Sequence, residues 1–394
     1  MTDRQRIGEA QPLFRRTLRQ GWECRYRIPN LIVSKRGTVF ALPEERVNGL
    51  ADEAKRHLVL RRSLDHGHTW TAMNVLYADD HPRVSHGYSG GVADLDTGRV
   101  FVFFRVSVVI GPDDIGGVWP EPWEIEHPAE ATALRAKLAP HVQTGLHLIW
   151  TDDEGESWSA PRPLDDALHV TNPVTGELRP FWPQFTGIQL RRGAHRGRLV
   201  IPGRGVSHTV PFALYAYGHN YVVYSDDHGV TWQPGGLTQN GTGEACLIEQ
   251  SDGTLYVNSR NESLRCRGYR AWDRSDDGGA TFTVSGYDLA LPEPHCAASL
   301  SRLPDGGILF CNPAVHSATP TVYDHAARHH LTVRLSYDDA RTWPVARTLC
   351  AGRAGYSALA VAHDGAILCA YETLTADSYT GDIMLVRLSQ GMLL

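Results

Sequence analysis

The chain has 394 residues, 42% of them hydrophobic, with 38 Gly, 23 Pro and a net charge of −6. This length can bury a large core, and the Gly and Pro content indicates many turns. The negative charge argues against a nucleic-acid partner, and the absence of any run of about 18 apolar residues predicts no membrane span.

The chain begins with the polar segment MTDRQRIGEAQP, which lacks the apolar centre of a signal peptide. The chain as given is therefore expected to be cytoplasmic, and a secreted origin with the signal removed stays open. Seven Cys, an odd number without paired spacing, predict reduced thiols rather than a disulfide framework. There is no CxxC or HExxH motif, so we expect no metal and no cofactor.

Pairs of apolar runs, each joined by a polar turn with Gly, follow one another along the chain and predict β-hairpins. The pairs are RIPNLIV with GTVFAL, GGVADL with GRVFVFF, GIQL with GRLVIP, ACLIEQ with GTLYVN, AASLSRL with GILFCN, and YSALAVA with GAILCAYE. The early run PLFRR is expected to add a strand to the last unit.

An eight-residue pattern, Ser/Thr-x-Asp-x-Gly-x-Thr/Ser-aromatic, follows the third apolar run of five units. The copies, here called Asp boxes, start at Ser63, Thr151, Ser225, Ser275 and Ser336, and the last has Ala340 in place of Gly. Gly supplies the positive φ that a tight turn needs, and Asp can accept hydrogen bonds from backbone N–H groups across the turn. Such repetition indicates one recurring β unit.

Three strands before each Asp box and one after it make a four-stranded unit. Six units predict an all-β, six-bladed β-propeller with four antiparallel strands per blade, in which sheet edges are short and protected. We expect residues 1–394 to form this single domain. The irregular stretch from Gly111 to Val142, with WPEPWEIEHP and the helix-like AEATALRAKL, is interpreted as a loop and short helix inserted in the second blade.

Alternating strand direction places the Asp boxes at one rim of such a propeller. The opposite rim then receives the starts of first and third strands, the ends of second strands, and the loops between second and third strands. The residues predicted there are Arg27, Arg46, Asp52, Glu244, Arg260, Arg328 and Tyr356. Arg46 and Asp52 are expected in the loop that follows the second strand of the first blade. This set, scattered in sequence, should converge around one axis and form a site.

With YRIP at Tyr26 and repeated Asp boxes, nearly the whole chain resembles exo-α-sialidases (neuraminidases) of the bacterial and animal type. The resemblance implies that three arginines bind the carboxylate of a substrate: Arg27, Arg260 and Arg328, with Arg334 as the alternative to the last. It also implies that Glu372 holds the first arginine and that Arg46 lies near the 4-position of the sugar.

The same resemblance implies that Asp52 is the general acid/base and that Tyr356 with Glu244 forms the nucleophile pair. A sialic acid carries a carboxylate on its anomeric carbon, which forked guanidinium groups can bind. A carboxylate nucleophile would be repelled by that anion, whereas a neutral phenol would not. Because the pKa of a free Tyr is about 10, the phenol needs a neighbouring base.

The sequence departs from this family at HGYSGGVAD and in the following Trp-rich stretch. Trp119 and Trp123 could line the pocket for the N-acyl group or could anchor the loop. The sugar therefore stays open among N-acetylneuraminic acid, its deaminated analogue Kdn and the smaller Kdo. His295 and Cys296 could also face the site. Hydrolysis versus transfer and the oligomeric state stay open, and the alternative function is a non-catalytic Asp-box propeller that binds sugars or protein.

Overall fold

The computed structural model describes residues 8–19, 21–47, 49–50, 54–81, 83–108, 143–164, 168–173, 178–205, 218–263, 265–317, 325–375 and 378–394, together with the single residues 129, 133 and 176. The predicted insertion between Gly111 and Val142 lies almost wholly outside them. Among the described residues, none belongs to a helix with the length and apolar character needed to cross a membrane.

Each of the predicted pairs of apolar runs forms an antiparallel hairpin. The first strands of these hairpins are β4 (Leu31–Val33), β9 (Val84–Ala93), β17 (Ile188–Gln189), β21 (Thr242–Glu249), β25 (Ser299–Arg302) and β28 (Val345–Val361). The second strands are β5 (Val39–Ala41), β10 (Val100–Val108), β18 (Leu199–Gly205), β22 (Leu255–Asn261), β26 (Ile308–Pro313) and β29 (Ile367–Leu374).

Outside these hairpins lie the predicted third and fourth strands. The third strands are β7 (Lys55–Ser63), β11 (Gly145–Thr151), β19 (His219–Ser225), β23 (Tyr269–Ser275), β27 (His329–Ser336) and β30 (Tyr379–Leu388). The fourth are β8 (Asn74–Tyr77), β12 (Arg162–Pro163), β20 (Gln233–Leu237), β24 (Val284–Pro292), the first half of β28, and β1 (Gln11–Phe14). Because β1 pairs with β30, the added strand predicted from PLFRR is confirmed.

The first hairpin is longer than predicted because it continues past a kink at Ile28, where φ is 52°. Beyond the kink, β3 (Trp22–Arg27) pairs with β6 (Glu44–Val47), and β2 (Thr17–Arg19) pairs with β3. The prediction that Arg46 lies in a loop is therefore wrong. Arg46 lies in β6, whose backbone is paired with β3 on one side and with β7 on the other.

Shorter elements complete the described chain. These are β13 (Val170–Thr171), β14 (Leu178–Arg179), β15 (Phe181–Pro183), β16 (Phe185–Thr186), and the 3-10 helices η3 (His325–Ala327) and η4 (Gln390–Met392). Strand β16 pairs in parallel with β9, and β15 pairs with β18. These additions bring residues 181–186 against the inner strands.

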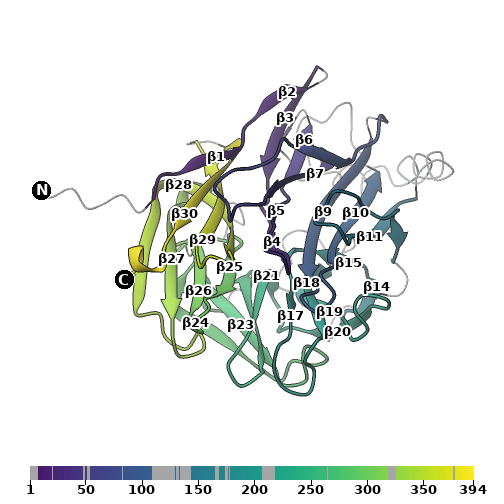
Figure 1. Cartoon of the computed structure of the whole chain (residues 1–394). Coiled ribbons are helices and arrows are strands. Elements are labelled where there is room, and N and C mark those ends of the chain that lie inside the picture. Colours follow the sequence, from purple (N-terminus) through teal and green to yellow (C-terminus); the bar gives the residue numbers. More distant parts are fainter. Residues whose placement is uncertain are drawn as a thin grey trace, which may run out of the picture.

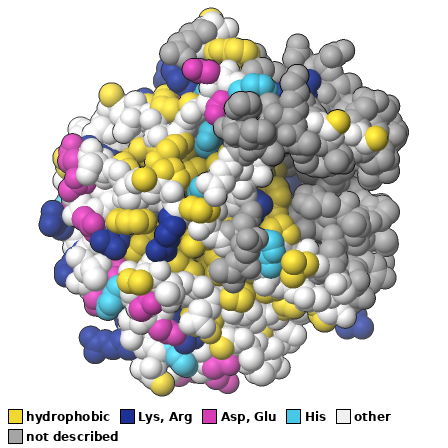
Figure 2. All heavy atoms as spheres, turned by 90° about the vertical axis from the view of Figure 1, so that its right-hand side faces the viewer, with side chains coloured by type: hydrophobic (Ala, Val, Ile, Leu, Met, Phe, Trp, Pro, Cys, Tyr) yellow, Lys and Arg dark blue, Asp and Glu magenta, His cyan; other side chains and the backbone are white. Residues whose placement is uncertain are grey.

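The first strands contact one another in chain order, from β4 through β9, β17, β21 and β25 to β28, and β28 contacts β4. These contacts close a ring, and Figure 1 shows the sheets arranged around its centre. The fold is a β-propeller. Adjacent sheets pack face to face through buried apolar side chains, such as Val39 and Val59 of the first unit against Ala360 and Leu368 of the last. On the face seen in Figure 2, basic and acidic side chains are interspersed over the described surface.

The Asp boxes form the predicted turns. In the first box, the Ser63 hydroxyl donates to Asp65 and accepts from the Gly67 N–H group, and Asp65 accepts from both the backbone and the hydroxyl of Thr69. The same bonds recur in the other boxes. The fifth keeps this geometry although Ala340 must adopt a φ of 62°, a conformation that is costly for a residue with a Cβ.

The fourth residue of each box also has positive φ and contacts the preceding sheet, at its hairpin turn in four of the five boxes. Glu154 accepts a hydrogen bond from Ser34 at 2.5 Å, and Asp339 accepts one from the Ser251 backbone at 2.9 Å. In the first box, the His66 carbonyl accepts from Arg387 of β30. After β30 there is no Asp box, and Gln390 of η4 instead donates to Asp305 in the turn between β25 and β26, at 2.6 Å.

Candidate active site

The structure brings Tyr356, Glu244 and Arg260 into direct contact from two separate sheets. The Tyr356 hydroxyl of β28 donates to Glu244 of β21 at 2.5 Å. Arg260, at the end of β22, donates from one nitrogen to Glu244 at 2.9 Å and to the Tyr356 oxygen at 3.2 Å. The Tyr356 ring packs on Phe185 and Cys296. This is the convergence predicted for the nucleophile pair and for one arginine of the clamp.

The surroundings of the pair hold the proton on the phenol. Burial and the charge of Glu244 raise the pKa of Tyr356 well above its usual value, against the opposing effect of Arg260 and Arg328. Burial acts to raise the pKa of Glu244, but the charge of Arg260 and the hydrogen bond from Tyr356 outweigh it and lower that pKa. At neutral pH these shifts favour a neutral phenol that points at a charged carboxylate, the protonation states that the predicted nucleophile pair requires.

Glu372 of β29 joins Arg27 to the backbone of Tyr356. Its carboxylate accepts from Arg27 Nε at 3.1 Å and Nη2 at 3.4 Å, and from the backbone N–H groups of Ile28 at 2.8 Å and Tyr356 at 3.0 Å. Glu372 is 1% exposed. The carboxylate that orients Arg27 therefore also holds the kink at Ile28 and the start of the second half of β28, which pairs with β29.

Arg328 directly precedes β27, as predicted, and its guanidinium lies 5.5 Å from the centre of the Tyr356 ring. It donates to the Tyr379 hydroxyl and to the His295 carbonyl. No carboxylate pairs with it within the described part of the chain, whereas Arg27 has Glu372 and Arg260 has Glu244. Arg328 is thus a buried cation, 1% exposed, and the acceptors that it meets in the described chain are both neutral.

The alternative third arginine, Arg334, lies within β27 and donates to the Asn312 side chain at 3.0 Å. None of its contacts in the described chain is with Tyr356, Arg27 or Arg260. The geometry therefore favours Arg328. Cys296 lies against the Tyr356 ring. The His295 ring is 3% exposed, and neither of its nitrogens has a hydrogen-bond partner among the described residues. Burial and the nearby arginines lower the pKa of His295 to about 3.

Arg46 is fully buried and donates to Glu44 from Nε at 3.2 Å and from Nη2 at 2.9 Å. Glu44 also accepts from the backbone N–H group of Tyr88 at 2.7 Å and lies 3.5 Å from Arg56, whose guanidinium is 3.9 Å from the centre of the Tyr88 ring. This group connects the first sheet to β9. Asp52, the predicted general acid/base, lies outside the described residues, as do Trp119 and Trp123.

Sequence reasoning missed Tyr379, whose hydroxyl accepts from Arg328 and whose ring centre lies 3.5 Å from the Arg27 guanidinium carbon. The rule that selected Arg328 would have found it, because Tyr379 also begins a third strand on the same rim. Three other residues were missed because the sequence gives no signal for the kink that extends the first hairpin. Glu44 lies in the extension itself, Arg56 lies in the adjacent strand β7, and Tyr88 lies in β9 of the next sheet.

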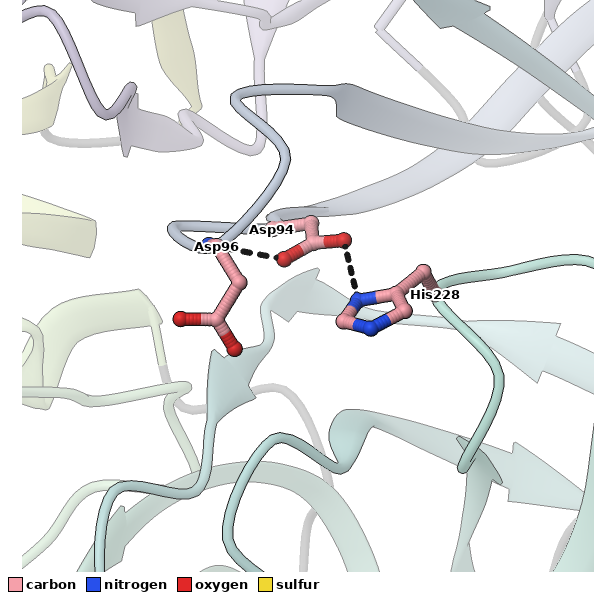
Figure 3. Close-up of side chains that lie close together, drawn as sticks. All are labelled: Asp94, Asp96 and His228. Atoms are coloured by element: carbon pink, nitrogen blue, oxygen red, sulfur yellow. Dashed lines mark hydrogen bonds and ion pairs between the residues drawn. The ribbon is translucent and has the colours of Figure 1, made fainter.

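A separate polar cluster lies among the hairpin turns at the Asp-box rim and consists of Asp94, Asp96 and His228 (Figure 3). Within the described ranges, no other group of three or more His, Cys, Asp or Glu side chains comes close enough to hold a metal ion. Asp94 already accepts hydrogen bonds from His228 and Gln189, both at 2.9 Å, and from Thr97 at 2.7 Å. These hydrogen bonds satisfy the buried carboxylate of Asp94, which therefore connects a hairpin turn to the third Asp box without a metal ion.

Residues 117–369 match the BNR repeat-like domain family. The chain is 32% identical over 365 residues to a sialidase of Micromonospora viridifaciens, covering 90% of this chain and 50% of that protein. It is 26% identical over 370 residues to a sialidase of Bacteroides fragilis, covering 89% of this chain and 60% of that protein. The chain thus spans half to three fifths of the length of these two curated relatives.

Among solved structures, the fold resembles the Hadza microbial sialidase Hz136, with a TM-score of 0.71, 22% identity, and coverage of 94% of this chain and 66% of that one. It also resembles a leech intramolecular trans-sialidase, with a TM-score of 0.67, 18% identity, and coverage of 93% and 68%. The resemblance to sialidases that YRIP and the Asp boxes indicated is confirmed.

Proposed function

Because the chain belongs to the BNR repeat-like domain family and its curated relatives are sialidases, we propose that it is a retaining exo-glycoside hydrolase. Its substrate is a terminal α-linked sialic acid, or a closely related nonulosonic acid such as Kdn or Kdo, on a glycoconjugate. The observation that carries this proposal is the 2.5 Å hydrogen bond between Tyr356 and Glu244, surrounded by Arg27, Arg260 and Arg328.

The three arginines bind the carboxylate on the anomeric carbon. Arg328 supports this role most directly, since it is buried with a positive charge that none of its described contacts neutralises. Burying a charge without a partner is costly, so an anion that reaches Arg328 gains both charge and hydrogen bonds. Arg27 and Arg260 have carboxylate partners that fix their orientation while their charges add to the binding of the anion.

The reaction then proceeds in two displacements. The Tyr356 oxygen attacks the anomeric carbon, its proton passes to Glu244, and the glycosidic bond breaks as Asp52 protonates the leaving oxygen. In the second step, Asp52 removes a proton from water, the water oxygen replaces Tyr356 on the anomeric carbon, and Glu244 returns the proton to the phenolate. Two inversions give retention. The neutral phenol avoids the repulsion that a carboxylate nucleophile would meet from the anion of the substrate.

Release of 4-methylumbelliferone from its α-sialoside, beside the Kdn and Kdo glycosides, tests the activity. Tyr356→Phe should lower turnover by orders of magnitude while the fold stays intact, because it removes one hydroxyl. Tyr256→Phe is the matched control, since Tyr256 is a buried tyrosine (1% exposed) that packs against Trp272 in another cluster. NMR of the first-formed sugar should show the α-anomer.

Near-normal turnover by Tyr356→Phe would overturn the assignment of the nucleophile. A first-formed β-anomer would overturn retention. If the wild-type protein binds these glycosides without cleaving any of them, it is a non-catalytic sugar-binding propeller instead.

A further inference from the structure

Tyr379 lies between two of the three arginines that surround the nucleophile. Its ring is stacked on Arg27, with 3.5 Å between the guanidinium carbon and the ring centre, and its hydroxyl accepts a hydrogen bond from Arg328. The side chain is largely buried, and it comes from the first residue of β30. One rigid side chain therefore fixes the spacing between two cations that belong to different sheets.

We propose that Tyr379 is a positioning residue that orients Arg27 and Arg328 for a carboxylate ligand without neutralising either charge. The proposal rests on the function proposed above and extends it to the source of affinity for the anion. Tyr379 has no part in the bond-breaking steps.

The chemistry of a phenol suits this position better than that of a carboxylate. Burial, opposed by the charges of Arg27 and Arg328, raises the pKa of Tyr379 to about 12, so the side chain is neutral at working pH. An aspartate or glutamate in its place would pair with Arg328 and cancel the charge that the ligand needs. The electron-rich face of the ring offsets part of the cost of burying Arg27, and the oxygen fixes one edge of Arg328.

Arg328 is held on two sides by neutral groups, since its other nitrogen donates to the His295 carbonyl. Its Nε atom is buried and has no hydrogen-bond partner among the described residues. The guanidinium is therefore rigid and still has donor capacity to offer. A planar cation fixed in this way loses little side-chain entropy when it binds a carboxylate, which increases affinity.

The backbone next to the nucleophile leaves room for this packing. At Gly355 a Cβ atom would lie 3.0 Å from a ring carbon of Tyr379 and 2.4 Å from a carboxylate oxygen of Glu372. Any larger residue would press on both side chains that hold Arg27. The glycine that precedes Tyr356 thus allows Tyr379 and Glu372 to approach the arginine together.

Tyr379→Phe separates the two contacts, because it keeps the ring face for Arg27 and removes the acceptor for Arg328. Tyr379→Leu removes both. Tyr221→Phe is the matched control, since Tyr221 is fully buried and its hydroxyl donates to the Leu168 carbonyl at 3.0 Å in a different sheet. The probes are the 2,3-dehydro analogue of the preferred sugar and its carboxyl methyl ester, and their affinities are measured by calorimetry, with melting curves for every variant.

We expect Tyr379→Phe to weaken binding of the free acid by about tenfold and Tyr379→Leu by more, as the loss of one and then two polar contacts implies. Binding of the methyl ester, which lacks the anion, should change much less. KM should rise more than kcat falls. Tyr221→Phe should bind both probes like the wild type, even if it melts at a lower temperature.

An equal loss of acid and ester binding in Tyr379→Phe would show that Tyr379 only supports the fold. Wild-type affinity for the acid in both Tyr379 variants would also overturn the proposal. Arg328→Ala separates these failures from a failure of the proposed function. If Arg328→Ala loses preference for the acid and Tyr379→Phe does not, only the positioning role is wrong. If the wild-type protein itself shows no preference for the acid, the carboxylate clamp is wrong.

Discussion

Replacing Glu372 with Gln tests how the carboxylate clamp is held. Each carboxylate oxygen accepts one bond from Arg27 and one from a backbone N–H group, of Ile28 on one side and of Tyr356 on the other. In Gln one of these oxygens becomes an NH₂ group that faces two donors. Whichever way the amide turns, two hydrogen bonds are lost and two buried donors remain unpaired.

Each unpaired buried donor costs about 1–3 kcal/mol, and breaking a buried ion pair costs about 3–5 kcal/mol. These ranges overlap, so we expect Glu372→Gln to lower the free energy of unfolding by about 4 kcal/mol. Because Arg27 loses one of its two bonds to Glu372 in either orientation, KM should also rise by about tenfold. The assays are urea denaturation and initial rates on the aryl sialoside, at a temperature where the variant is folded.

Glu249→Gln is the matched control. Glu249 is 4% exposed and accepts from the backbone N–H groups of Arg191 and Arg192, both at 2.9 Å, and from the Arg192 side chain at 3.4 Å, next to a hairpin turn at the Asp-box rim. It should lose stability but keep the wild-type KM. If Glu372→Gln also keeps the wild-type KM, Glu372 stabilises the fold without orienting Arg27 for the ligand, which would refute the role proposed for it.

Three further predictions separate scaffold from site. Asp227→Ala removes the acceptor for Ser225 and Thr231 in the third Asp box, so it should lower the free energy of unfolding by about 2 kcal/mol in denaturation curves without changing turnover. Asp52→Ala should instead slow cleavage of natural linkages far more than cleavage of an activated aryl glycoside. A catalytic defect in folded Asp227→Ala, or equal losses on both substrates for Asp52→Ala, would contradict these roles. Arg328→Ala should lower the affinity for an anionic inhibitor by about tenfold to a hundredfold or more, whereas Arg334→Ala should leave it unchanged. The reverse result in a binding titration would exchange the assignments of the two arginines. Burial lowers the pKa of His86 from 6.5 to about 4. The unfolded chain therefore binds a proton at this residue before the folded protein does, and the free energy of unfolding should fall by about 3 kcal/mol as the pH drops from 6.5 toward 4. His86→Leu should lose less stability across this window, and equal losses in parallel denaturation series would disprove the role of His86.

The sequence was sufficient to predict the hairpins and most of the site because both depend on repetition. Strand periodicity and turn residues recur in each unit, and alternating strand direction then places the ends of strands on one rim, which selects Arg260 and Arg328. It was not sufficient for Arg46, because a positive φ at Ile28 has no signature in the side chain and extends the hairpin past its predicted end. Tyr379 begins a third strand on the same rim and was open to the same rule, but its contacts with Arg27 and Arg328 arise only when three separate segments meet.

The contact between Gln390 and Asp305 marks a junction of the ring that is closed differently from the others. At the other junctions of the ring, an Asp box anchored by a serine or threonine hydroxyl and a carboxylate contacts the preceding sheet. At this junction an amide from a single helical turn replaces it, and Gln390 also donates to Tyr337 at 2.8 Å. The strand β28 crosses the same junction, since its first half pairs with β27 and its second half with β29. The junction without an Asp box is thus the one that the backbone itself bridges, through the strand that carries Tyr356, so an Asp box is not needed there to connect the two sheets.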